Sequence, residues 1–189
     1  MNGSNSNNFI IDGETITVDK YVGVEAGTLQ ITSGALTATT NTGSTNIYTG
    51  YNIHGGTLDI DGGTVSFGET SDNTAALNID DGGTLDISGG TLNVSDEIIV
   101  GATAGATITQ TGGTINIRNY NGSDNQGSHK FNVDAGTLNL TAGTININGE
   151  SGTSSHYSVD IESGATVNAN SNHTIVIMDN TSGTSTENR

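Results

Sequence analysis

Two aspartates that occupy the same place in a repeated phrase are the first candidates for chemistry in this sequence. Asp59 and Asp86 each stand in the phrase Thr-Leu-Asp-Ile, and Asp61, Asp80 and Asp81 stand beside these phrases. If the two phrases lie side by side, like charges meet. That is unfavourable unless water and salt screen them or a hard cation such as calcium bridges the carboxylates. We expect a solvated acidic corner and no cofactor, with calcium bound near these residues as the alternative.

A second group of residues combines cations, an acid, an imidazole and an aromatic ring. Arg118 and Lys130 flank a polar segment that also contains Tyr120, Asp124 and His129. In enzymes that cleave acidic polysaccharides, carboxylates act as acid or base while Lys or Arg stabilises the charge that develops on the substrate. Loop tips carry such residues without any catalytic role, and a strongly anionic protein repels an anionic polymer. We therefore predict no enzymatic activity, with a carbohydrate-active lyase or hydrolase as the alternative.

These residues are positioned by a repeat that runs along most of the chain. The phrase is small-Gly-Thr-apolar-x-apolar, and its threonines come in pairs seven residues apart. From Thr28, the first members of successive pairs follow after 29, 27, 23 and 30 residues. A phrase that returns at such a period indicates a repeat architecture. The pairs are Thr57 and Thr64, Thr84 and Thr91, Thr107 and Thr114, and Thr137 and Thr144, and Thr28 pairs in the same way with Ala35.

Within each phrase the apolar residues alternate with polar ones, which is the pattern of a half-buried β-strand. Two successive phrases, seven residues apart, are here called a doublet. A further apolar pair, such as Leu77 and Ile79, precedes each doublet. Two folds can use this pattern: an antiparallel sandwich of hairpins, or a parallel β-helix in which each repeat stacks on the last. Each of the two strands of a doublet begins with its own small-Gly-Thr sequence, which is typical of a tight corner. The long insertions, at residues 39–50, 68–74, 119–130 and 148–156, keep one position per repeat, which favours stacked coils.

The predicted fold class is therefore all-β, a right-handed parallel β-helix (solenoid) of about six to seven coils of about 23 to 30 residues, with three short strands each. We expect residues 9–178 to form this single β-helix domain, with polar tails at residues 1–8 and 179–189. Glycine supplies the positive φ of tight corners, and the sequence has no proline to interrupt the ladders.

Stacking would align the outward residues of successive coils in rows of hydroxyl, amide and carboxylate groups. Small polar side chains of this kind solvate a sheet and hydrogen-bond along it without binding anything else. The alternative is a recognition surface for glycans or ice. An ice-binding row would need regular Thr-x-Thr, and here the second position is mostly Asp or Asn. The candidate binding residues of this outward row are Thr57, Asp59, Thr84, Asp86, Thr137 and Asn139.

Charge and composition exclude several classes of function. The 189 residues include 4 Lys and Arg against 20 Asp and Glu, for a net charge of −16. Nucleic acids and anionic membrane surfaces are bound by cationic surfaces, so neither is an expected partner. No apolar run approaches the roughly 20 residues of a membrane-spanning helix, so we expect no membrane insertion. Without cysteine there is no disulfide, no thiol nucleophile and no cysteine-ligated metal.

The phrases Gly-Gly-Thr-Leu-Asp-Ile at residues 55–60 and Gly-Gly-Thr-Leu-Asn-Val at residues 89–94 resemble the repeats of bacterial surface and secreted β-helical proteins. Autotransporter passenger domains and large repeat adhesins are examples, and the resemblance covers about residues 9–178. It implies an extracellular or cell-surface location and a role as a stalk, adhesin or fibre segment. We expect further repeats or copies of the chain to stack end to end on its terminal coils. Host or surface glycans and proteins are the other expected partners.

Overall fold

All regular structure in the described part of the chain is β-strand. The computed structural model describes residues 7–19, 22–38, 51–68, 76–95, 97–101, 105–118, 128–148 and 156–178. The predicted insertions and tails lie wholly or mostly outside these ranges. The strands are β1 (Asn8–Val18), β2 (Gly23–Val24), β3 (Thr28–Ala38), β4 (Tyr51–His54), β5 (Thr57–Ile60), β6 (Thr64–Phe67), β7 (Leu77–Asp80), β8 (Thr84–Ile87), β9 (Thr91–Val94), β10 (Ile98–Val100), β11 (Ala106–Gln110), β12 (Thr114–Arg118), β13 (Ser128–Val133), β14 (Gly136–Leu140), β15 (Gly143–Asn148), β16 (His156–Ile161), β17 (Thr166–Ala169) and β18 (His173–Met178).

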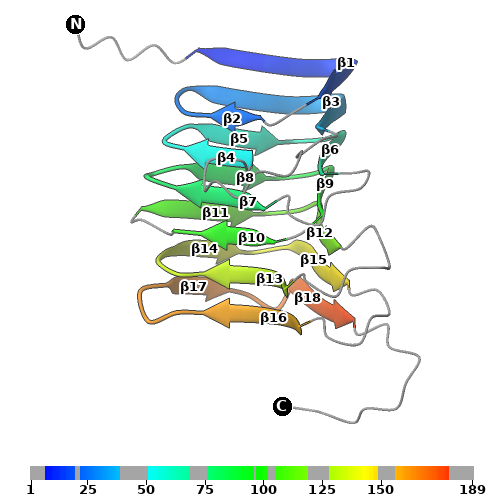
Figure 1. Cartoon of the computed structure of the whole chain (residues 1–189). Coiled ribbons are helices and arrows are strands. Elements are labelled where there is room, and N and C mark those ends of the chain that lie inside the picture. Colours follow the sequence, from blue (N-terminus) through cyan, green and yellow to red (C-terminus); the bar gives the residue numbers. More distant parts are fainter. Residues whose placement is uncertain are drawn as a thin grey trace, which may run out of the picture.

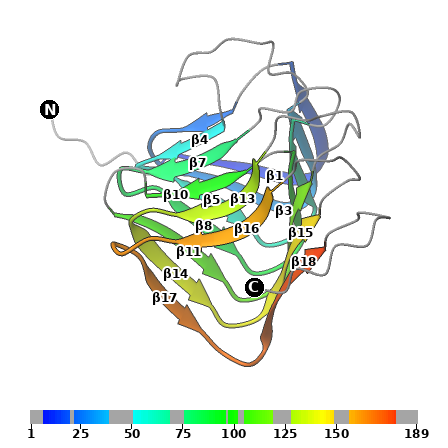
Figure 2. The same cartoon turned by 60° about the horizontal axis from the view of Figure 1, so that its bottom comes forward.

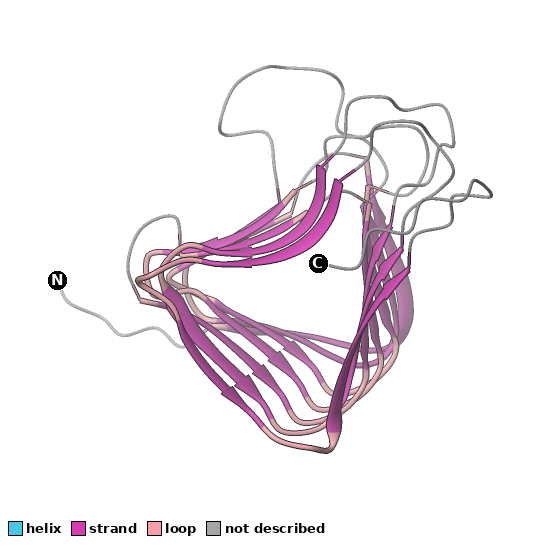
Figure 3. Cartoon of the chain, turned by 90° about the horizontal axis from the view of Figure 1, so that it is seen from below, coloured by secondary structure: helices cyan, strands magenta, loops and turns pink. Residues whose placement is uncertain are grey.

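The strands form three walls around a common interior, and every strand pairs in parallel with the equivalent strand of the neighbouring turn (Figure 1). The first wall contains β3, β5, β8, β11, β14 and β17, and the second contains β3, β6, β9, β12, β15 and β18. The third wall contains β2, β4, β7, β10, β13 and β16, and the last five of these lie side by side in Figure 2. Figure 3 looks along the stack and shows the three walls surrounding the interior. The two strands of a doublet, such as β5 and β6, lie in different walls, so the hairpin interpretation is wrong and a parallel solenoid is confirmed.

The register of the walls follows the repeated phrase. Thr57 pairs with Thr84 and Asp59 with Asp86 across β5 and β8. On the second wall, Thr64 pairs with Thr91 across β6 and β9. Equivalent residues of successive phrases therefore stack on one another, although the spacing between phrases varies along the chain. Most of the variation in spacing comes from the segments that lead from the second wall to the third, which differ in length from turn to turn.

The prediction of short strands is wrong for the first turns, where β1 and β3 each have 11 residues. The first half of β3 pairs with β5 and its second half with β6, so one strand rounds the corner between two walls. Gly34, with φ of +85°, bends this strand without ending it. The pairing of β1 with β3 shifts register around Asp12, which is how a bulge lets a strand turn.

The core consists of apolar side chains that point inward from all three walls and stack in rows. In one such row, Leu58, Leu85 and Ile108 are each at most 1% exposed. Stacking removes both sides of each side chain from water, which one turn alone cannot do. Five of these inward rows can be followed from one end of the stack to the other. They run from Phe9 to Val167, from Ile11 to Ala169, from Ile16 to Ile175, from Val18 to Ile177 and from Val24 to Ile161.

The described residues include no helix that is long and apolar enough to cross a membrane.

Candidate functional site

The first wall brings together three of the aspartates singled out in the sequence. Asp59 on β5 and Asp86 on β8 are neighbours in the outward row, and both side chains are half-buried. Burial raises the pKa of Asp59, and the charges of Asp61 and Asp86 raise it further. Burial followed by the charge of Asp61 raises the pKa of Asp86 in the same way. The surroundings of Asp59 and Asp86 therefore oppose the ionisation of these two carboxylates.

Asp61, at the corner that follows β5, is held by neutral hydrogen-bond donors. The hydroxyl of Ser88 donates to its Oδ1 over 2.6 Å, and the amide of Gln30 donates to its Oδ2 over 2.8 Å. These two hydrogen bonds, with Ser88 contributing more, lower the pKa of Asp61. The contacts link three successive turns, because Gln30, Asp61 and Ser88 belong to the turns of β3, β5 and β8. The carboxylate thus joins coils to one another through groups of the chain itself.

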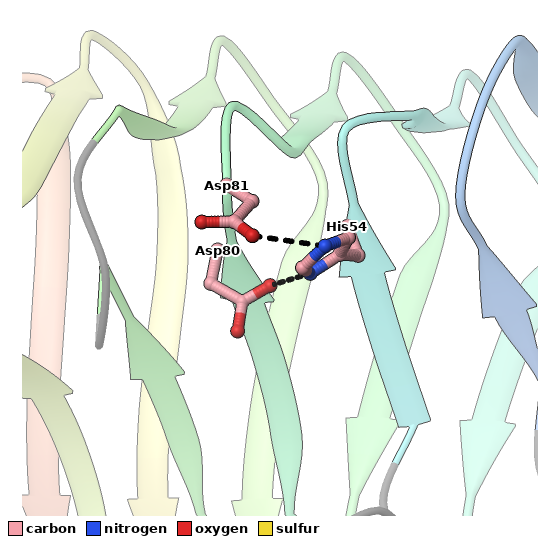
Figure 4. Close-up of polar contacts among 3 residues, drawn as sticks. All are labelled: His54, Asp80 and Asp81. Carbon is pink, nitrogen blue, oxygen red and sulfur yellow. Dashed lines mark hydrogen bonds and ion pairs between the residues drawn. The ribbon is translucent and has the colours of Figure 1, made fainter.

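Asp80 and Asp81 form a separate group around His54, at the corner between β7 and β8 (Figure 4). Nδ1 of His54 lies 2.7 Å from Oδ1 of Asp80, and Nε2 lies 2.9 Å from Oδ2 of Asp81. The hydrogen bond to Asp80 raises the pKa of His54, and the charges of Asp80, Asp81 and Glu25 add to the effect. With a carboxylate at each ring nitrogen, the imidazolium form, which donates from both, is favoured.

The sequence reasoning grouped Asp80 and Asp81 with Asp59 and missed their histidine. His54 precedes Asp80 by 26 residues, which is within the range of the repeat, and the two residues pair in register across β4 and β7. The period could therefore have found this contact. The described residues contain no group of three or more His, Asp or Glu with the geometry to hold a metal ion. Calcium near Asp59, Asp61, Asp80, Asp81 and Asp86 stays a prediction.

The remaining candidate residues lie in the same outward row as Asp59 and Asp86. Thr57, Thr84 and Thr137 occupy equivalent, half-buried positions on β5, β8 and β14, with Thr107 of β11 between the last two. Asn139 on β14 accepts a hydrogen bond of 3.0 Å from the side-chain amide of Asn168. The structure thus places the predicted residues along one face of the first wall.

A second row on the next wall, here called the asparagine row, consists of Ser66, Asn93, Asn116 and Asn146. Each side-chain amide donates to the residue of the preceding turn: Asn146 to Asn116 over 2.9 Å, Asn116 to Asn93 over 2.9 Å, and Asn93 to Ser66 over 3.1 Å. Asn116 and Ser66 are buried despite their outward position. This row uses its polar groups to hold turns together.

One buried polar residue interrupts the inward rows. Gln110 is fully buried in the row of Ile31, Ile60 and Ile87, and its amide donates to the carbonyls of Gly113 and Thr144 over 3.3 Å each. Its Oε1 lies 2.8 Å from Nε2 of His173. Because the amide nitrogen already donates twice, Oε1 is the acceptor and His173 carries its proton on Nε2. Burial lowers the pKa of His173.

The residues considered for catalysis are not assembled into a site by the described contacts. Nζ of Lys130 lies 3.4 Å from Oδ2 of Asp160, and Glu97 on the same wall has its pKa raised chiefly by burial. Tyr120 and Asp124 lie outside the described residues, as do the side chains of Arg118 and His129.

No protein-family model, curated protein or solved structure matches this chain. Its function therefore has to follow from the geometry of its own residues.

Proposed function

We propose that the chain is a non-catalytic structural segment: a stalk, adhesin or fibre element built as a right-handed parallel β-helix of about six to seven coils of about 23 to 30 residues. We further propose that it works outside the cell or on a bacterial cell surface. The resemblance of its Gly-Gly-Thr phrases to bacterial surface repeats supports that location. Abundant Thr and Asn and the absence of cysteine fit the same setting.

The asparagine row is the observation that carries this proposal. A catalytic or ligand-binding surface aims polar groups at a cavity or at solvent, where a ligand can reach them. Here the amides of Asn146, Asn116 and Asn93 are used on one another along the stack. Asp61 is likewise satisfied by Ser88 and Gln30 of adjacent turns. Because these polar groups form contacts between coils, they support a structural role for the stack.

Glycan binding on the first wall is a second candidate. It is favoured by Asp59 and Asp86, whose half-buried carboxylates sit in register on neighbouring strands. Carboxylates in such a row accept hydrogen bonds from sugar hydroxyls. This role is compatible with the structural one, since an adhesin needs both a rigid rod and a contact surface.

The proposal is tested by assaying the full chain for uronate release from acidic polysaccharides and for binding on a glycan array. We expect no product above that of a heat-denatured control. If glycans bind, the double variant Asp59→Asn, Asp86→Asn should lose the signal, while Asn146→Ser on the other wall should keep it. Release of unsaturated or reducing sugars that is lost in Lys130→Ala would overturn the non-catalytic assignment.

A further inference from the structure

Apolar side chains of the inward rows, most of which are buried inside the stack, are partly or largely exposed at its two ends. At the N-terminal end, Phe9 is 57% exposed and borders an open hollow of about 590 Å³. Ile16 and Val18, which are partly exposed, line the same hollow, and so do Ile11 and Val24, which are at most 7% exposed. At the C-terminal end, Ile161, Val167, Ile175 and Ile177 are between 41% and 51% exposed. Contiguous apolar surface of this kind marks an interaction site.

The two exposed surfaces are the opposite ends of the same inward rows. The row that begins at Phe9 ends at Val167, the row of Ile16 ends at Ile175, and the row of Val18 ends at Ile177. Inside the molecule, each residue of a row rests on the equivalent residue of the next turn. A residue placed as Phe9 is placed would therefore complete the row at Val167, and the same holds for the other rows of the first and second walls.

The backbone has the same polarity at both ends. In the pairings of the described strands, β1 pairs only with β3, and β17 and β18 pair only with β14 and β15. Within the described residues no strand covers the outer edges of these strands, and the N–H of Asp12 on β1 donates to the side chain of Glu14 over 3.1 Å. All pairings inside the stack are parallel, so an edge of β1 in the same orientation continues the ladders of β17 and β18. A contact between the two different ends does not close on itself, and it propagates into a filament.

We propose that a second copy of this chain docks head to tail, with its β1 edge paired with β17 and β18 of the first copy and the inward rows of the first and second walls continuing in register. The proposal rests on the structural role proposed above and names the partner. Both ends carry acidic side chains, Asp12 and Glu14 at one and Asp160 and Glu162 at the other. Added salt screens this repulsion, so association should strengthen with ionic strength while the apolar rows supply the attraction.

Disulfide trapping tests the register directly, because the natural chain has no cysteine. Thr17 and Val176 are the two ends of one outward row, six pairings apart. Six strand spacings of about 4.8 Å separate them by about 29 Å within a molecule, too far for a disulfide. In the proposed contact they are direct neighbours. Under mild oxidation at high salt, Thr17→Cys, Val176→Cys should give dimers, trimers and longer species that reductant dissolves.

A control variant, Thr17→Cys, Asn168→Cys, places the second cysteine at the same end but on another wall. It should give at most about a tenth of the crosslinked product, because its cysteines do not meet across the proposed contact. Equal yields from the two variants would show random collision and would overturn the register.

A charge exchange separates docking from folding. Phe9→Glu and Val167→Lys each place a charge in an apolar contact and should each weaken self-association by at least about tenfold. Because Phe9 and Val167 meet only across the contact, mixing the two variants should restore association. Circular dichroism checks that each variant is folded. The proposal is overturned if the natural chain sediments as a monomer at about 1 mM and high salt. A chain whose own tails cover the two ends would also sediment as a monomer, and this arrangement too would overturn the proposal. Uronate release would refute the non-catalytic role without changing these results.

Discussion

His54 and His173 stand in environments that push their protonation in opposite directions. His54 lies between two carboxylates, and the hydrogen bond to Asp80 raises its pKa. His173 donates to a neutral amide oxygen at the edge of the core, and burial lowers its pKa. Donation from both nitrogens of His54 requires the charged ring, whereas His173 can donate its one hydrogen bond in either form and burial favours the neutral ring.

We predict that an NMR titration will place the midpoint of His54 above about 6.5 and that of His173 below it. The folded-state pKa of His54 exceeds its unfolded value. Its contribution to stability is therefore complete below about pH 6.5 and is lost as pH rises through the folded-state pKa. For His173 the order is reversed, so protonation opposes folding below about pH 6.5. Asp80→Asn should lower the midpoint of His54 and leave that of His173 in place. Equal midpoints would contradict at least one of the two assignments.

At the scale of the element, the corners depend on glycines that stack on one another. Gly34, Gly63, Gly90 and Gly113 occupy equivalent corners, all with positive φ. A Cβ built on Gly90 would lie 2.6 Å from the backbone carbon of Gly62 in the preceding turn. Glycine is needed here both for the left-handed backbone and for the close approach of two turns.

Two alanine substitutions separate these causes. Gly82 also has positive φ, at +85°, but a Cβ there would meet nothing within 4 Å. We predict that Gly82→Ala lowers the free energy of unfolding by about 1 kcal/mol, through backbone strain alone. Gly90→Ala should cost about 3 kcal/mol, because steric overlap adds to the strain. Chemical denaturation measures both, and equal losses would show that the corner does not bring the turns into contact.

The sequence predicts the elements better than it predicts the contacts between side chains. Threonine spacing was enough for the parallel pairing of Thr57 with Thr84, because one apolar face must be buried and a slip by one residue would expose it. The continuous β3 was not predictable, because Gly34 reads like every other corner glycine. The spacing of 26 residues could have predicted the contact of His54 with Asp80, whereas the contact of the same ring with Asp81 depends on side-chain rotamers at the corner. The contact of Gln110 with His173 was not predictable, because Gln110 stands at a position of the repeat that is otherwise apolar and the two residues are 63 residues apart.

At the scale of the molecule, the repeat produces a rod whose interior and surface are both organised in rows. In the proposed filament, the net charge of −16 opposes association of the rods at low salt, and contact between the apolar ends of the inward rows favours it. Structural function and head-to-tail docking both require one uninterrupted stack from β1 to β18. A break in register at any turn would remove the match between the two ends.

The distance between the two ends of one row tests this stack most directly. Spin labels on Thr17→Cys, Val176→Cys, diluted into unlabelled chain at low salt, report the distance within a single molecule. Six pairings of about 4.8 Å predict one narrow distribution centred near about 29 Å. A broad distribution, or one centred well away from that distance, would contradict a single stack in continuous register.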